Sequence, residues 1–193
     1  MRLITSMLVS FALAAPALAD GWKQYADPTY AFAVSFPGDP QVETTTYTAP
    51  DGRSVPARVY SVTQETGSFK MTVADLSDTG LEERAVIDSA IKTLSQEGEV
   101  KLDIPARVSR VFGRQLSILG QDGSRSAVAL FFHAGRLYQV EGTSLPAGNA
   151  TADAIRFQQS LIFTDNWSNV PAGERDGRRR REQRREGGAE QPL

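Results

Sequence analysis

Cysteine is absent from the 193 residues, and histidine occurs once. Without cysteine the chain forms no disulfide, holds no iron–sulfur cluster or thiolate zinc site, and has neither a cysteine nucleophile nor a lipoprotein anchor. A single histidine also excludes a metal site built from several imidazoles. We therefore expect no metal and no other cofactor.

A long apolar run is missing as well. The most apolar stretch, Leu3–Ala15, is shorter than the roughly 20 residues that a membrane span requires. It follows Arg2 and precedes Ala17-Leu18-Ala19, a small–x–small sequence typical of signal peptide cleavage. The pattern predicts a secretory signal peptide over 1–19, cleaved after Ala19. The mature protein would then be periplasmic or secreted and would not span the membrane.

The other end of the chain is dominated by arginine and has no periodic apolar residues, so we predict a disordered tail over 171–193. Six arginines and one glutamate give its densest part a net charge of +5, whereas residues 20–170 hold 13 Lys and Arg against 18 Asp and Glu, a net charge of −5. The arginines are Arg178, Arg179, Arg180, Arg181, Arg184 and Arg185. Such a tail suits anionic lipids or an envelope polyanion. The alternative is a solvated tail that folds back on the acidic domain. Nucleic acid is not an expected partner outside the cytoplasm.

Residues 20–170 between these segments predict a single domain. Alternating apolar positions predict four strands, at 30–36, 42–48, 55–63 and 69–74. Apolar residues at helical spacing then predict a helix over about 81–94, ended by Gly98. Four more strands and a helix at about 151–161 follow. Since no βαβ pattern repeats, we expect an α+β fold with a mainly antiparallel sheet of about six to eight strands and helices covering both faces.

Two turn signals, Asp122-Gly123 and Ala134-Gly135, fix an expected register for the last three strands. If both loops contain two residues, Leu116 pairs with Ala129, and Leu130 pairs with Gln139. One face of the sheet then carries Phe112, Leu116, Ile118, Ala127, Ala129, Phe131, Tyr138 and Val140. The segment 127–132 is apolar on both faces, which predicts an interior strand covered from both sides.

In this register four polar residues, Gln115, Ser117, Gln139 and Glu141, share the face of Val128 and Leu130. A few polar groups around an apolar floor are typical of a small ligand pocket. The alternative is that the two flanking strands extend beyond the covering helix, so that these side chains are solvated.

The chain has no Gly-x-Ser-x-Gly nucleophile elbow. His133 lies where a hairpin turn begins, opposite Arg136, which favours a half-solvated residue over a general base. The acidic residues Asp75, Asp78, Glu82 and Glu83 fit no calcium loop. Carboxylates at this place instead favour the start of a helix, through its dipole.

Two short segments resemble a known family. Tyr30-Ala31-Phe32-Ala33-Val34-Ser35-Phe36-Pro37 is similar to the opening strand of PsbP-like domains, in which an aromatic–glycine–aromatic strand ends in proline, although Ala31 replaces the glycine. Phe157-Gln158-Gln159-Ser160-Leu161 is similar to their closing helix, with Leu161 in place of an aromatic residue. The resemblance implies an exported α-β-α sandwich, commonly an accessory or binding subunit without catalysis. The whole chain also resembles exported proteins of alphaproteobacteria, which implies no particular function.

Three functions stay open. The first is a non-enzymatic exported binding or accessory module of the cell envelope, with an unknown envelope partner or a small ligand. The second is a carboxylate-based hydrolase, which needs two acidic groups in one cleft. The third is a structural envelope protein held to polyanions by its tail. The lack of a nucleophile motif favours the first.

Overall fold

The computed structural model describes residues 21–146, 148 and 150–165. The predicted signal peptide and arginine-rich tail lie outside these residues. The described elements, in chain order, are β1 (Lys23–Asp27), β2 (Phe32–Phe36), β3 (Gln41–Thr48), β4 (Ser54–Gln64), β5 (Gly67–Asp75), α1 (Glu83–Glu97), β6 (Gly98–Val108), β7 (Val111–Gly120), β8 (Arg125–His133), β9 (Arg136–Ser144), α2 (Thr151–Gln158) and β10 (Ile162–Phe163).

Two antiparallel sheets organise these elements. The larger has seven strands in the order β3-β4-β5-β9-β8-β7-β6, and the smaller has three in the order β1-β2-β10. This confirms the expected α+β class and the mainly antiparallel sheet of six to eight strands. Strands β1 and β10 were not predicted from the sequence. Strand β10 has only two residues, and it pairs with β2, which is distant in the sequence, through Ile162 and Ala33. A local sequence pattern therefore does not predict it.

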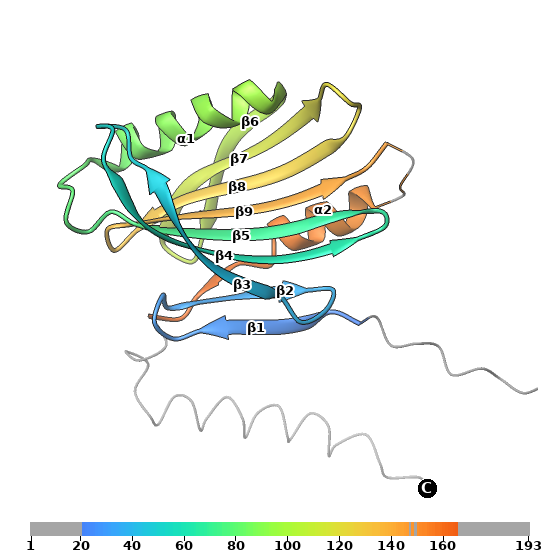
Figure 1. The fold of residues 1–193 in the computed structure, drawn as a ribbon, viewed down its shortest axis with the longest axis horizontal. Coiled ribbons are helices and arrows are strands. Elements are labelled where there is room, and N and C mark those ends of the chain that lie inside the picture. Colours follow the sequence, from blue (N-terminus) through green and yellow to red (C-terminus); the bar gives the residue numbers. More distant parts are fainter. Residues whose placement is uncertain (1–20, 147, 149, 166–193) are drawn as a thin grey trace, which may run out of the picture.

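Helix α1 lies on one face of the large sheet, over β6, β7 and β8 (Figure 1). Its apolar stripe, Val86, Ile87, Ala90 and Leu94, is buried against that face. The stripe follows the helical period in the sequence, which is why the helix was predictable. Gly98 ends α1, as expected, and it is also the first residue of β6.

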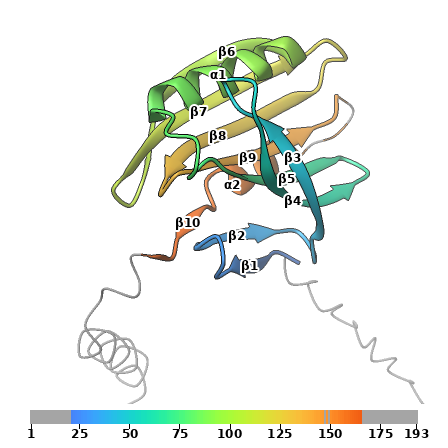
Figure 2. The same ribbon diagram turned by 60° about the vertical axis from the view of Figure 1, so that its left-hand side comes forward.

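The opposite face is covered differently from the prediction. Helices do not cover both faces, because α2 has only eight residues and the three-stranded sheet packs beside it (Figures 1 and 2). The aromatic rings of Phe32 and Phe36 on β2 join Phe157 of α2 in one buried core. Gly142 allows α2 to approach β9 closely, since a Cβ there would lie 2.6 Å from the Cα of Ala154.

The loop between β7 and β8 corrects the expected register by one residue. Leu116 pairs with Val128, not with Ala129, because the loop contains Gln121, Asp122 and Gly123. Gly123 has a φ of 83°, the left-handed conformation that closes a three-residue hairpin loop. The β8–β9 loop does contain two residues, and Leu130 pairs with Gln139 as expected.

A shift of one residue moves every side chain of a strand to the other face. Leu116 and Ile118 therefore lie with Val128 and Leu130 beneath α1, and not with Ala129 as predicted. The interior strand β8 is buried on both faces, as expected, and alternate residues Val128 and Leu130 pack on one core. Ala129 and Phe131 pack on the other.

We expect Leu130→Ala to lower the free energy of unfolding by about 2–5 kcal/mol, because the fully buried side chain leaves a cavity between β8 and α1. Leu102→Ala on β6 is the matched control, since Leu102 is 44% exposed and should cost less than about 1 kcal/mol. Urea unfolding of both variants measures the difference. Similar losses at the two positions would contradict the assigned packing.

Candidate functional site

The structure separates the four polar residues that the sequence placed on one face. Gln139 and Glu141 lie on the α1 face, as expected from the confirmed β8–β9 register. Gln115 and Ser117 pair with Ala129 and Ala127 and so lie on the opposite face. The predicted single pocket is therefore wrong in its geometry, because the three-residue loop reverses the orientation of β7. Ligand binding by any of the four stays a prediction.

Glu141 and Gln139 form part of a connected polar group. The Nε2 of Gln139 donates a hydrogen bond to Oε2 of Glu141 at 3.1 Å. The Nζ of Lys70, directly across on β5, lies 3.0 Å from the same oxygen. Glu141 is only 8% exposed, and a buried carboxylate needs such partners to offset its desolvation. Lys70 therefore neutralises a charge in the middle of the sheet.

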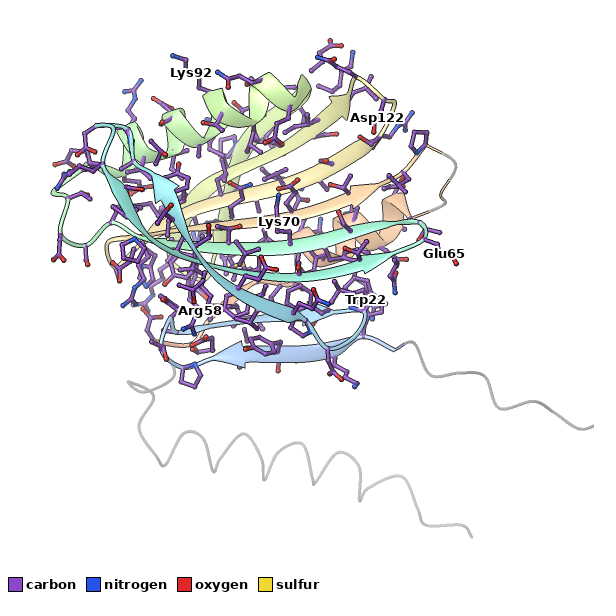
Figure 3. All side chains as sticks on the ribbon, viewed as in Figure 1. Trp22, Arg58, Glu65, Lys70, Lys92 and Asp122 are labelled. Carbon is purple, nitrogen blue, oxygen red and sulfur yellow. The ribbon has the colours of Figure 1, made fainter. Side chains whose placement is uncertain are left out.

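This group belongs to a larger polar area on the part of the α1 face formed by β4, β5, β8 and β9. Paired positions bring its side chains together, and Oγ of Ser126 lies 2.8 Å from Oγ1 of Thr143. We call this area the open polar surface: Ser61, Lys70, Thr72, Ser126, Gln139, Glu141 and Thr143. All but Glu141 are half-buried, and α1 contacts mainly β6, β7 and β8. Figure 3 shows Lys70 on the sheet away from the helix.

Gln115 has a different role on the opposite face. Its Nε2 donates to Oε1 of Gln158 at 2.8 Å. The Nε2 of Gln158 in turn donates to the backbone oxygens of Val128, at 2.6 Å, and Leu116, at 3.3 Å. Gln158 is 4% exposed, so these bonds satisfy a buried amide and attach α2 to the sheet. Gln115 thus stabilises the position of α2.

A third polar group, at the end of the sheet near the β1–β2 turn, was not predicted. The hydroxyl of Tyr60 donates to Oδ2 of buried Asp27 at 2.6 Å. The backbone N–H groups of Thr29 and Tyr30 donate to Oδ1 of Asp27, and Arg58 approaches at 3.5 Å. Aspartate followed by Pro28 is a turn signal, but the partners on β4 come from the tertiary structure.

Two arginines lie against the Tyr30 ring in this group. The guanidinium carbons of Arg58 and Arg136 are each 5.4 Å from the ring centre, a cation–π distance. The hydroxyl of Tyr138 donates to the carbonyl of Tyr30 at 2.8 Å. Arg136 also lies 3.6 Å from Asp75. Charged side chains of both signs therefore surround Tyr30 where the two sheets meet.

His133 lies at the start of the β8–β9 turn, half-buried and opposite Arg136, as the register predicted. Its Nε2 contacts Oδ2 of Asp165, and its ring packs 4.9 Å from Phe163. Asp165 lies 32 residues along the chain, so the sequence did not reveal this pair.

The acidic residues before α1 do not gather into a metal site. Asp75 accepts hydrogen bonds from the backbone and hydroxyl of Ser77, which lower the pKa of its carboxyl. Glu82 caps α1 through its backbone, and Glu83 lies in the first turn. In the described part of the chain, no three acidic or histidine side chains converge as metal ligands would.

A small hollow lies away from all four predicted residues. Its volume is about 240 Å³, below the usual range for ligand pockets. It is lined by Gly123, Arg125, Ser144, Leu145, Pro146, Gly148 and Thr151.

Among the described residues, no helix has the length and apolarity needed to cross a bilayer. The six tail arginines lie outside the described residues.

The fold has a similar solved structure. No family model and no curated protein sequence matches the chain. The solution structure of cyanobacterial PsbP (CyanoP) from Synechocystis sp. PCC 6803 is similar, with a TM-score of 0.51 and 12% identity over 77% of this chain and 96% of that chain. A crystal structure of the Pseudomonas aeruginosa protein of unknown function PA94, a putative regulator, gives a TM-score of 0.37 and 9% identity over 65% and 84% of the two chains. The CyanoP similarity confirms the resemblance to PsbP-like domains at the level of the fold.

The Asp27 network predicts a pH dependence. Burial acts to raise the pKa of Asp27, but the hydrogen bonds from Tyr60, Tyr30 and Thr29, together with Arg58, outweigh it and lower that pKa. Ionised Asp27 therefore stabilises the fold above its unfolded pKa of about 3.9, and this contribution is lost as the pH falls through the lower folded pKa. We expect Asp27→Asn to reduce neutral-pH stability by about 1–3 kcal/mol and to flatten the acid limb of the stability curve.

Urea unfolding from about pH 7 to about pH 2 measures this effect. Asp39→Asn is the control, because Asp39 forms an exposed pair with Lys23. Its curve should follow that of the wild type in acid. Equal acid slopes for the wild type and Asp27→Asn would contradict the assignment.

Proposed function

We propose that the chain is an exported binding or accessory module of the cell envelope that acts without catalysis. In this proposal the signal peptide 1–19 directs export, the mature protein is periplasmic or secreted, and the open polar surface binds the partner. The PsbP-like fold supports the accessory role, because PsbP-like domains are commonly accessory or binding subunits.

The open polar surface is the observation that carries the proposal. Hydroxyl, amide and ammonium groups from four strands lie on one rigid sheet, and the Lys70 side chain remains 41% exposed. The side chain of Glu141 is only 11% exposed, so the surface presents the ammonium more than the carboxylate. Such a surface suits a partner rich in hydrogen-bond acceptors. Its polarity is compatible with binding, because the interfaces of non-obligate protein complexes are about as polar as the rest of a protein surface.

The hydrolase alternative has less support. A pair of carboxyl groups would have to face each other across a bound substrate. The groups on Oε2 of Glu141 are instead the ammonium of Lys70 and the amide of Gln139. Neither of these groups is a carboxyl, so they do not form the pair of acidic groups that such a hydrolase uses.

We expect Thr72→Arg to abolish the capture of a specific envelope partner, since it places a long charged side chain on the open polar surface, directly across from Gln139. The tagged protein, purified after export, is the bait for envelope extract, and bound proteins are quantified by mass spectrometry. A partner enriched by the wild type should be lost with Thr72→Arg while the melting temperature changes little.

Thr93→Arg is the matched control, because Thr93 is exposed on α1 away from this surface. It should retain the partner. Loss with both variants, or with neither, would place binding elsewhere, and the absence of any enriched partner or ligand would contradict the proposed module.

The arginine-rich tail supports a second, additive interaction with anionic envelope surfaces. Each arginine gains about 1 kcal/mol near an anionic membrane, and the gain decays within a Debye length of about 10 Å at 0.1 M salt. The acidic domain opposes this attraction. We expect weak binding to vesicles of phosphatidylglycerol and phosphatidylethanolamine, lost at high salt and on deletion of 171–193.

Co-sedimentation with these vesicles measures the binding. The deletion should leave the melting temperature unchanged, since the tail offers no apolar residues at core spacing. Equal binding with and without the tail would move the interaction to the domain. A lowered melting temperature would mean that the tail packs on it.

A further inference from the structure

The two edges of the large sheet differ in how they are protected. Strands β3 and β6 form these edges. The outer N–H and C=O groups of an edge strand can pair with another strand, and proteins commonly prevent this with proline, lysine, bulges or charges.

Strand β6 has several of these features. Pro105, near its middle, lacks an N–H group. The register with β7 shifts at Lys101, whose ammonium pairs with Glu99. Asp103 forms an ion pair with Arg114 at 2.6 Å. Another strand would therefore find an irregular and charged edge here.

Strand β3 has none of these features except one charge. Its sequence, Gln41–Thr48, contains four threonines, no proline and no lysine or arginine, and Glu43 is its single charged residue. Its register with β4 is unbroken over eight pairs. Every side chain but that of Tyr47 is exposed. Threonine-rich sequence of this kind favours strand pairing.

We propose that β3 is a dimerisation edge, on which β3 of a second copy pairs antiparallel about a two-fold axis perpendicular to the sheet. An isologous contact of this kind closes after two copies. Facing residues in such a pair are identical or lie an even number of positions apart, because strand residues alternate in orientation.

The charge of β3 fits this arrangement. Two registers pair most of the strand, one with Thr44 opposite Thr44 and the other with Thr45 opposite Thr45. In the first, Glu43 faces Thr45, and in the second it faces Tyr47. Neither brings two like charges together, whereas a register centred on Glu43 does so and pairs fewer residues.

The same axis brings the two open polar surfaces to one side of the dimer. Facing residues keep the same face of the sheet, and each surface begins on β4, the neighbour of β3. The contact consists mainly of two eight-residue strands, so its area is at the small end for specific interfaces and the dimer should be weak.

Sedimentation equilibrium of the protein purified after export, at about 10–500 μM, tests the proposal over the affinity range of small interfaces. We expect concentration-dependent dimers. The double variant Thr44→Lys, Thr46→Lys should weaken association at least about tenfold, because lysines then face each other in either register. The control Leu102→Lys, Ile104→Lys alters two exposed residues of β6 and should leave association unchanged. A monomer at every concentration, or dimers lost only in the β6 control, would overturn the proposal.

The absence of cysteine permits a second test of register. Thr44→Cys or Thr45→Cys should form a disulfide-linked dimer under mild oxidation, since the thiols of one variant face each other across the axis. Lys92→Cys on α1 is the control and should form far less. Cross-linking of neither β3 variant, or equal cross-linking of the control, would overturn the proposed contact.

Discussion

The alternating burial of side chains along β8 is the constraint on which the rest of the structure depends. Val128 and Leu130 require a cover on one face, and Ala129 and Phe131 require one on the other. Helix α1 provides the first cover, and α2 with β1-β2-β10 provides the second. The direct contact of α2 with Gly142 and the bonds of Gln158 then fix the second cover against the backbone of the sheet.

The two covers differ in extent, and this difference creates the candidate binding surface. The apolar stripe of α1 covers only the part of the sheet face formed mainly by β6, β7 and β8. The rest of that face, the open polar surface, carries hydroxyl, amide and charged groups. A carboxylate in this position is stable because Lys70 and Gln139 contact it. On the opposite face the Asp27 and His133 contacts close the end of the core, so their polar groups stabilise the fold. Polar residues of similar type thus have distinct roles according to the cover beside them.

A single loop residue decided how much of the site was predictable. Asp-Gly occurs both in two-residue hairpin loops and at the end of three-residue loops, and the sequence does not distinguish them. The Ala134-Gly135 loop has the expected length, so Gln139 and Glu141 lie on the predicted face. The Asp122-Gly123 loop is one residue longer, and Gln115 and Ser117 therefore lie on the other face. The backbone of Ala31 was not predictable either. Its φ of 51° lies in the left-handed region, which glycine adopts most readily, and Ala31 stands where the PsbP-like opening strand has glycine.

The sequence by itself determined the strand and helix periods, the apolar character of β8 and the α+β class, because these depend on the spacing of residues along the chain. Tertiary structure alone decided which face of β7 meets α1, which segments form the second cover, and which partners Asp27, Glu141 and His133 have. These outcomes depend on loop geometry and on contacts between distant segments such as β10 and β2. The sequence shows the period of a strand. Which face of the sheet its polar residues occupy depends on the pairing register, which is set only when the strands assemble into the sheet.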